Sequence, residues 1–393
     1  MLYHHGSTDY QTAASDAAKH ARSIMERKIE EGRASAVKLF DHAHTVVPED
    51  AIVRARALDF TTEKYEAMVP AARGDAARKE ERARLVLALG DARRTVHRHA
   101  LGQVAEKAGV PGAYLTELTT NAKPWQAELA AHVLDQHFRQ GNPDARFLAR
   151  SVSGELRGFL SDRYRRLDSR PLLDAFAEAC GAVGAVPVEG TVTDTRLSLK
   201  AFLPMVFEPI ENEVMCLGID WSNSDFGNGK HAVRAMIWRL WCTNKATCED
   251  ALAQVHLGGR LGDDIEFSQK TYELDTRTSV SALRDTVKGL LGPAKVNTLL
   301  ETIKSANEKQ IDWRGLKGTL EKKLLKGEMK AVEDAFKSED VVMLPAGQTA
   351  WRASNAISWI AGKTADAERR LELERLAGVV ATGTKDAASK EAA

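Results

Sequence analysis

The sequence has no surplus of either charge and no long apolar run. Lysine plus arginine and aspartate plus glutamate both number 55 in 393 residues, so the formal net charge is zero. A nucleic-acid site must therefore come from local segregation of charge, because the chain as a whole does not attract phosphate. No segment approaches the roughly 18 to 20 apolar residues that a membrane helix needs, so we expect no membrane partner.

Cysteine is scarce, and its spacing is irregular. The four positions form no CxxC pair, which zinc sites commonly use: Cys180, Cys216, Cys242 and Cys248. A zinc site that joins some of them to nearby histidines is the weaker alternative. Without a recognisable secretory signal, the pattern favours reduced thiols in a cytoplasmic protein.

Catalytic motifs are missing as well. The chain has no GxSxG, HExxH or GxGxxG, and the GNGK at 227–230 lacks the other residues of a phosphate-binding P-loop. We therefore expect a protein that is not an enzyme and that needs no metal or other cofactor. A metal-dependent nuclease, which needs several carboxylates around its ions, is a weaker alternative based on Asp220, Asp225, Asp263, Asp264 and Glu266.

The chain is organised around residues 212–250. Residues 214–221 and 232–242 are rich in β-branched and aromatic residues, and the turn-forming SNSDFGNGK lies between them, which predicts a long β-hairpin. Its second arm carries Arg234 and Trp238 on one register and Arg239 and Trp241 on the other. At most one of these tryptophans can then face a ligand. A strand that only filled a core would keep its charges on one face, so the hairpin is a candidate binding surface.

Two further hairpins and a helix complete the predicted core. The hairpins are expected at 147–160, around Ser153-Gly154, and at 186–204, and the helix begins at Asp168 and runs to Cys180. The sequence thus predicts an α+β fold in which a central antiparallel sheet of hairpins, with an interposed helix, is flanked by helical N- and C-terminal regions.

The predicted domain organisation follows from this core. It consists of a mainly helical region at 1–141, the antiparallel core at 142–260, a helical region at 261–380 and a disordered tail at 381–393. Within the first region we expect a short strand, a largely helical segment, a helix-turn-helix unit and an amphipathic helix, at 51–60, 61–90, 101–118 and 125–140.

The strongest functional signal is an arginine-rich segment. Between residues 146 and 170 there are seven arginines against three acids, interleaved with Phe147, Phe159 and Tyr164. Guanidinium groups bind phosphate through two parallel hydrogen bonds, and aromatic rings contribute ~1–3 kcal/mol per stacked base. If the three hairpins share one sheet, cations of the later strands extend the same strip. The predicted nucleic-acid-binding residues are Arg150, Arg157, Arg163, Tyr164, Arg165, Arg166, Lys200, Trp221, Arg234, Trp238, Arg239 and Lys245. The alternative, of equal weight, is that the arginines pair with acids of neighbouring helices or of another subunit.

Three motifs resemble a known family. They are LRGFLSDRYRRLDSRPLLDAF, then GIDWSNSDFGNG followed by IWRLWCTNKAT, and finally TAWRASNAISWIAGKTADAERRLELERLAG. In this order they look like the signature of the phage and plasmid proteins grouped as domain of unknown function 932, and the resemblance covers roughly residues 100–380. It implies a role in the DNA metabolism of mobile elements, in the cytoplasm of a bacterial host.

We therefore expect a phage or prophage protein that binds single-stranded DNA without sequence preference, in the manner of a single-strand annealing (recombination) protein, and forms a homo-oligomer. The main alternative is a non-catalytic structural protein that assembles through its helical regions, with the arginines at subunit contacts.

Overall fold

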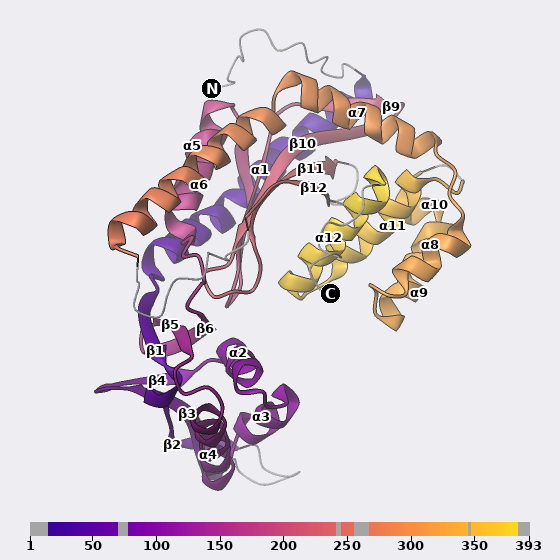
Figure 1. The fold of residues 1–393 in the computed structure, drawn as a ribbon. Coiled ribbons are helices and arrows are strands. Elements are labelled where there is room, and N and C mark those ends of the chain that lie inside the picture. The colour runs from indigo at the N-terminus through magenta and orange to yellow at the C-terminus, as the bar shows by residue number, and fades with distance from the viewer. Residues whose placement is uncertain (1–14, 70–77, 241–244, 255–266, 345–346, 384–393) are drawn as a thin grey trace.

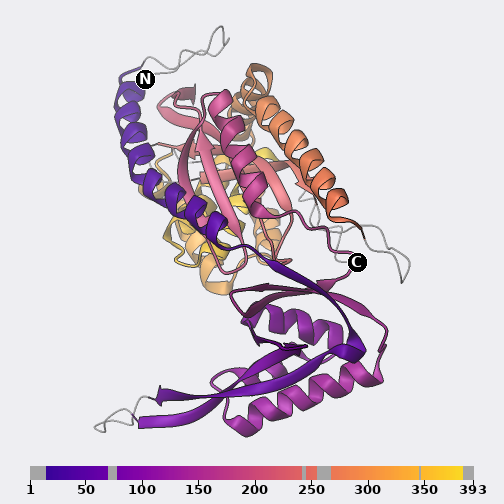
Figure 2. The same ribbon diagram turned by 90° about the vertical axis from the view of Figure 1, so that its left-hand side faces the viewer.

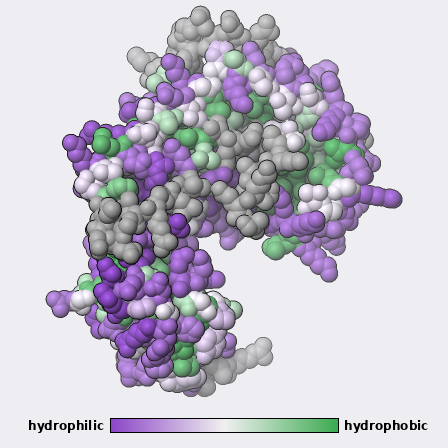
Figure 3. Space-filling view, viewed as in Figure 1, coloured by the Kyte–Doolittle hydropathy of each residue, from purple (hydrophilic) through white to green (hydrophobic). Residues whose placement is uncertain are grey.

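The protein has an α+β fold, as predicted, built around two separate β-sheets (Figures 1 and 2). The computed structural model describes residues 15–69, 78–240, 245–254, 267–344 and 347–383. The first sheet and its helices form one lobe, which we call the first lobe, and the second sheet with the remaining helices forms the second lobe. A notch separates the two lobes on one side of the molecule (Figure 3).

The first sheet has the strand order β1-β5-β6-β4-β3-β2. Its strands are β1 (Glu49–Arg54), β2 (Asp59–Val69), β3 (Arg78–Leu89), β4 (Ala92–Val96), β5 (Arg146–Val152) and β6 (Glu155–Ser161). All pairs are antiparallel except β4 with β6. A short 3-10 turn, η1 (Ala55–Ala57), follows β1.

Three helices pack on this sheet, α2 (Arg98–Ala108), α3 (Gly112–Thr119) and α4 (Pro124–Gln140). The predicted helix-turn-helix pair is thus present as α2 and α3, and its apolar residues lie in the core of the first lobe. Phe138 of α4 stacks on Phe60 at 5.8 Å between ring centroids, and Phe147 stacks on Phe159 at 4.9 Å. These rings fill the space between helix and sheet.

The prediction that residues 61–90 are largely helical is wrong. They form most of the β2 and β3 hairpin, an arm that extends from the first lobe (Figure 2). The charged, alanine-rich composition suits a helix, but Leu85 and Leu87 bury against the helices of the lobe. Opposite charges also face each other across the strands, as in the pair between Glu63 and Arg84 at 3.0 Å. Tertiary contacts here outweigh intrinsic helix propensity.

The second sheet has the order β12-β11-β10-β8-β7, with β9 also paired to β10. Its strands are β7 (Val186–Val192), β8 (Leu197–Phe202), β9 (Phe207–Ile210), β10 (Glu213–Asn223), β11 (His231–Arg239) and β12 (Lys245–Gln254). The predicted central hairpin is therefore β10 and β11.

All three predicted hairpins are present, but they do not share one sheet. The β5 and β6 hairpin belongs to the first sheet, whereas β7 with β8 and β10 with β11 belong to the second. The interposed helix, α5 (Ser169–Ala182), leads from one sheet to the other. The domain boundary predicted at residue 142 separates β1 to β4 from β5 and β6 of the same sheet. Because the three hairpins do not share one sheet, their cations do not form one continuous strip.

Helix α1 (Asp16–Thr45) crosses the edge of the second sheet at strand β7. A Cβ atom on Gly32 would lie 1.6 Å from the carbonyl oxygen of Val188, and one on Gly190 would lie 2.4 Å from that of Ser35. Glycine on both elements is what lets the two backbones approach this closely. The N-terminal half of α1 then packs on Phe202 and Trp238, and its C-terminal half reaches the core beside α5.

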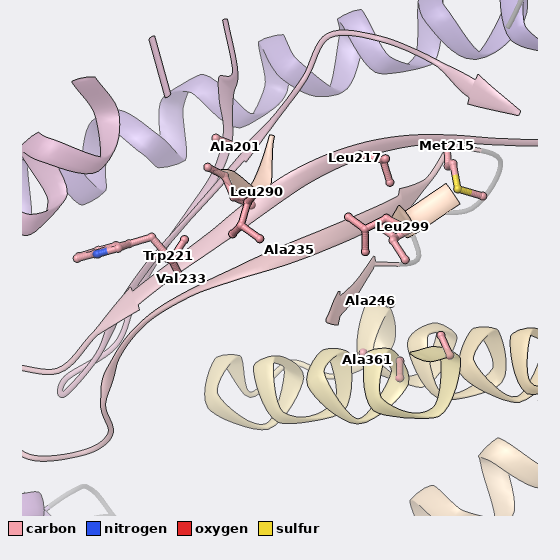
Figure 4. Close-up of a cluster of buried hydrophobic side chains, with 14 of the residues drawn as sticks. Ala201, Met215, Leu217, Trp221, Val233, Ala235, Ala246, Leu290, Leu299 and Ala361 are labelled. Atoms are coloured by element: carbon pink, nitrogen blue, oxygen red, sulfur yellow. The ribbon is translucent and has the colours of Figure 1, made fainter. Parts of the chain in front are cut away.

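The C-terminal region is helical, as predicted. It contains α6 (Gln269–Leu290), α7 (Pro293–Glu308), α8 (Trp313–Leu320), α9 (Lys326–Lys337), α10 (Glu339–Val342), α11 (Ala350–Lys363) and α12 (Ala367–Thr382). Several of these helices share the large core of the second sheet, where Trp221, Val233 and Leu290 lie (Figure 4). Among the described residues, no helix is long and apolar enough to cross a membrane. Residues 384–393 of the expected tail lie outside the described residues.

Candidate nucleic-acid interface

Half of the predicted DNA-contacting residues are in the interior. Six side chains are almost completely buried, so the prediction that they bind nucleic acid is wrong for Arg150, Lys200, Trp221, Arg234, Trp238 and Arg239. Sequence alone shows a cation among apolar neighbours but not the acid that neutralises it. Each buried cation has such a partner in this protein.

Arg150 lies at a joint between the two lobes. Its Nε donates to Asp50 at 2.7 Å, one terminal nitrogen donates to Asp168 at 2.6 Å, and the other donates to the backbone carbonyl of Asp225 at 2.8 Å. The guanidinium is therefore held on three sides by protein groups. Buried arginine is stable only when it is paired and hydrogen-bonded in this way.

The SNSDFGNGK turn forms the other side of this joint. The hydroxyl of Tyr164 donates to the carbonyl of Ser224 at 3.0 Å, and both the amide and the hydroxyl of Ser169 donate to Asp225 at 2.8 Å. Burial, with the nearby charge of Asp168, raises the pKa of Asp225 to about 6. His99 and Gln103 of α2 both bond the carbonyl of Phe226. The turn thus ties the first lobe to α5, and Tyr164 is not available to stack on a base.

Lys200 belongs to a buried charge network on the second sheet. Its Nζ donates to Glu374 of α12 at 2.7 Å and to Glu189 of β7 at 2.8 Å. Lys245, another predicted DNA contact, also pairs with Glu189, and its ammonium lies 5.8 Å from the Trp238 ring. Burial lowers the pKa of Lys245. Glu374 and Glu189 raise that of Lys200 although burial opposes the charge.

This network borders a cavity of about 320 Å³ between α1 and α12. Its charged lining is balanced, with three cations and three acids: Lys28, Lys245, Arg370, Glu31, Glu189 and Glu374. The cavity therefore has no net preference for an anion such as DNA.

Arg234 and Arg239 point to opposite sides of the second sheet. Arg234 donates to Ser222 at 2.9 Å and pairs with Asp220, which shares its face of the sheet. Arg239, on the other register, donates to Glu213 and, at 3.1 Å, to Asn355 of α11. One DNA track along both arginines is therefore excluded, and Trp221 packs in the core beside Phe176. Trp241 lies outside the described residues.

Four predicted contacts remain accessible: Arg157, Arg163, Arg165 and Arg166. Arg157 pairs with Glu155 at 2.9 Å on β6. Arg165 donates through Nε to Asp275 of α6 at 2.7 Å, and Arg166 pairs with Asp50 at 3.3 Å. Most of these arginines thus pair with acids of the chain, but only Arg165 pairs with an acid of a neighbouring helix, and the others pair with acids on strands or in loops. The alternative that they contact another subunit stays a prediction. Arg163 is exposed, and its side chain has no ion pair with a described residue.

Two aromatic residues that sequence reasoning missed, Tyr272 and Phe267, lie on the side of Arg166. The guanidinium of Arg166 is 4.5 Å from the ring centroid of Tyr272, and Phe267 meets Tyr272 edge-on at 6.0 Å. Phe267 is 45% exposed. We call Arg166, Tyr272 and Phe267, together with Arg165, which also contacts α6, and the exposed Arg163 next to them in the chain, the arginine-aromatic patch. No local signal connects its halves, because they are more than 100 residues apart in the chain.

The carboxylates proposed for a nuclease are not gathered in the described part of the chain. Asp220 and Asp225 are buried in separate hydrogen-bond networks, with Ser198 and with Ser169. No group of three or more metal-ligating side chains occurs among the described residues, and Asp263, Asp264 and Glu266 lie outside them. Cys180 and Cys216 are buried free thiols, and burial raises the pKa of each.

Comparisons of the chain with protein-family models, with curated proteins and with solved structures find no match. The resemblance to domain of unknown function 932 therefore stays a prediction that rests on the three motifs of the sequence.

Proposed function

We propose that the protein binds single-stranded DNA through the arginine-aromatic patch, without catalysis, as part of the DNA metabolism of a phage or plasmid. The observation that carries this proposal is the contact of Arg166 with Tyr272, next to the exposed ring of Phe267. Guanidinium groups that bind phosphates and rings that stack on bases are the two components that single-strand binding proteins combine. The family resemblance supplies the biological context.

Phosphate has to compete with two ion pairs of the patch, both of which are half-buried. The side chains of Arg165 and Asp275 are 26% and 33% exposed, and those of Arg166 and Asp50 are 20% and 19% exposed. A phosphate can exchange with a carboxylate at such partly exposed pairs, and Arg163 needs no exchange because it is exposed and has no ion pair with a described residue. The buried pairs of Arg150 and Lys200 cannot exchange in this way, because removing one partner leaves a buried charge without a counter-charge.

Fluorescence anisotropy with a labelled oligothymidylate tests the proposal. Three phosphate contacts should give a slope of about −2 in a plot of log K against log salt concentration. Phe267→Ala should weaken binding by about 5- to 150-fold, the loss of one stacked base. Arg163→Ala should weaken binding and reduce the magnitude of the salt slope by about 0.7, the value for one phosphate contact on a single strand.

Two matched controls separate the patch from general surface effects. Arg284→Ala removes an exposed arginine on the same helix α6, where it pairs with Glu178, and should leave DNA binding unchanged. Leu325→Ala removes an exposed apolar side chain from the connection between α8 and α9 and should also have no effect. If the oligonucleotide is not bound by the unaltered protein, or if the controls weaken binding as much as the patch variants, the proposal is wrong.

A further inference from the structure

Strand β2 is a long edge strand with no described strand on its outer side. It ends the order of the first sheet and is 11 residues long. Near its base, helix α4 covers it, and the amide of Phe60 donates to Asp135 at 2.9 Å. Further along, the side chains are open, with Lys64 55% and Glu66 69% exposed on either side of the exposed Tyr65.

An edge of this kind is a template for pairing with another strand. Its outward N–H and C=O groups have no partner in the sheet, and proteins usually shorten or block such an edge. A two-stranded hairpin is also only marginally stable in water by itself. The β2 and β3 arm therefore gains backbone hydrogen bonds and a third strand if β2 pairs with a further chain.

We propose that the partner is a second copy of this protein, whose β2 pairs antiparallel with this β2 around a two-fold axis at Tyr65. A two-fold axis perpendicular to a sheet keeps each face of the sheet on its own side. Residues directly opposite each other must then be both even-numbered or both odd-numbered, because side chains alternate between faces. This leaves only registers in which one residue faces its own copy.

Charge selects among these registers. An axis at Glu63, Lys64 or Glu66 would place that residue opposite its own copy, which is unfavourable for like charges. An axis at Tyr65 places Tyr65 opposite Tyr65 and Lys64 opposite Glu66, twice in the dimer. In this register no two like charges face each other between residues 61 and 69.

The ion pairs already present on the arm extend this arrangement. Within one chain, Lys64 lies 3.2 Å from Glu81, and Glu66 lies 2.7 Å from Lys79. In the dimer, each Lys64 would lie between Glu81 of its own chain and Glu66 of the other copy. Each Lys64 then has one acid of its own chain beside it and one acid of the other copy opposite it, which favours this partner over an unrelated strand.

A mixing experiment with single charge reversals tests the pairing. Lys64→Glu alone places two acids opposite each other, and Glu66→Lys alone places two lysines opposite each other. Analytical ultracentrifugation should show each homodimer weakened by about tenfold or more. In an equimolar mixture, Glu at 64 of one chain meets Lys at 66 of the other, and the second pair is native, so the heterodimer should recover the affinity of the unaltered protein.

The mixture controls for damage to the arm itself, because each variant chain is the same in both species. A monomeric unaltered protein across the concentration series, or a mixture no tighter than the separate variants, would overturn the proposal. Arg78→Glu, on the inner strand of the arm, should leave the dimer unchanged.

Cysteine cross-linking tests the position of the axis. Tyr65→Cys should form an intermolecular disulfide on mild oxidation, because opposite Cα atoms in an antiparallel pair are about 4.5–5.5 Å apart. Met68→Cys is more exposed but would lie about 20 Å from its copy, so it should not cross-link. Equal cross-linking of the two variants would show that the axis does not pass through Tyr65. None of these changes touches the arginine-aromatic patch, so the outcome is independent of DNA binding.

Discussion

The two sheets of the protein use charged side chains differently. On the second sheet Lys200, Arg234 and Arg239 lie in the interior, each paired with an acid or amide from another element. On the arm of the first sheet, Lys64 and Arg84 are more than half exposed and pair across neighbouring strands. The same residue types therefore link the sheet to its helices in the interior of one lobe and form exposed pairs on the surface of the other. Composition alone does not distinguish these roles, because burial decides how much a charge pair contributes.

The largest expected effect is on the interior charges. Lys200→Ala leaves Glu374 and Glu189 without a shared cation, and the free energy of unfolding should fall by about 3–5 kcal/mol. Urea unfolding followed by circular dichroism measures this. The double variant Lys200→Met with Glu374→Leu should recover part of the loss, since no buried carboxylate then remains without its lysine at that position. A loss below about 1 kcal/mol for Lys200→Ala would contradict the interior role.

The packing of helices on the two sheets gives the next effect. Gly32→Ala in α1 places a methyl group against the backbone of β7 and should lower stability by about 1–3 kcal/mol. Gly102→Ala in α2 of the first lobe has open space around its new Cβ and should raise stability by about 0.5–1 kcal/mol. Thermal unfolding of both variants makes the comparison. Equal effects of the two changes would show that the close crossing of α1 does not constrain residue 32.

Acid should affect the interior network in a defined range of pH. Burial raises the pKa of Glu189, but the charges of Lys200 and Lys245 lower it by more, so it lies below the ordinary value of 4.5. A lowered folded-state pKa means that this carboxylate adds stability above pH 4.5 and loses that contribution as the pH falls through the folded-state pKa. Lys245→Met removes one of the two lysines and should make the decline in unfolding free energy below pH 4.5 shallower. An unchanged slope would place the acid sensitivity elsewhere.

The smallest effect is expected on the surface of the first sheet. Arg84→Ala removes an exposed pair with Glu63 and should change the free energy of unfolding by at most about 0.5 kcal/mol. Urea unfolding under the conditions used for Lys200→Ala gives a direct ratio between the lobes. A loss similar to that of Lys200→Ala would abolish the distinction between surface and interior pairs.

Local patterns were enough to predict most of the elements. The helices expected at 125–140 and 168–180 are α4 and α5, and the turn at Ser153-Gly154 joins β5 to β6 with positive φ at both residues. These features depend on amphipathic spacing and turn chemistry, which the sequence displays directly. The strands at 59–69 and 78–89 could not be predicted from local patterns, because the contacts that favour them come from α4, which is distant in the sequence.

The candidate site was harder to predict, because its chemistry depends on long-range partners. Nothing near Arg150 in the sequence identifies Asp50 as its partner, and nothing near Lys200 identifies Glu374. Local sequence patterns also do not show that the three hairpins divide between two sheets. This division separates the arginines that were predicted to form one strip. The resemblance motifs contain the turn at 222–230, but only the structure shows that this turn joins the lobes.

The crossing of α1 over β7 also has a consequence during synthesis. Met25 and Ile29 of α1 pack against Phe202 and Trp238, which follow them by roughly 200 residues in the chain. Because the ribosome adds ~5–20 residues per second, the apolar side of α1 stays without its packing partners for about 10–40 s of synthesis. The first lobe, complete once β6 is made, can fold in that interval. The nascent chain thus carries a folded first lobe and an unsatisfied N-terminal helix, which is a suitable target for a chaperone.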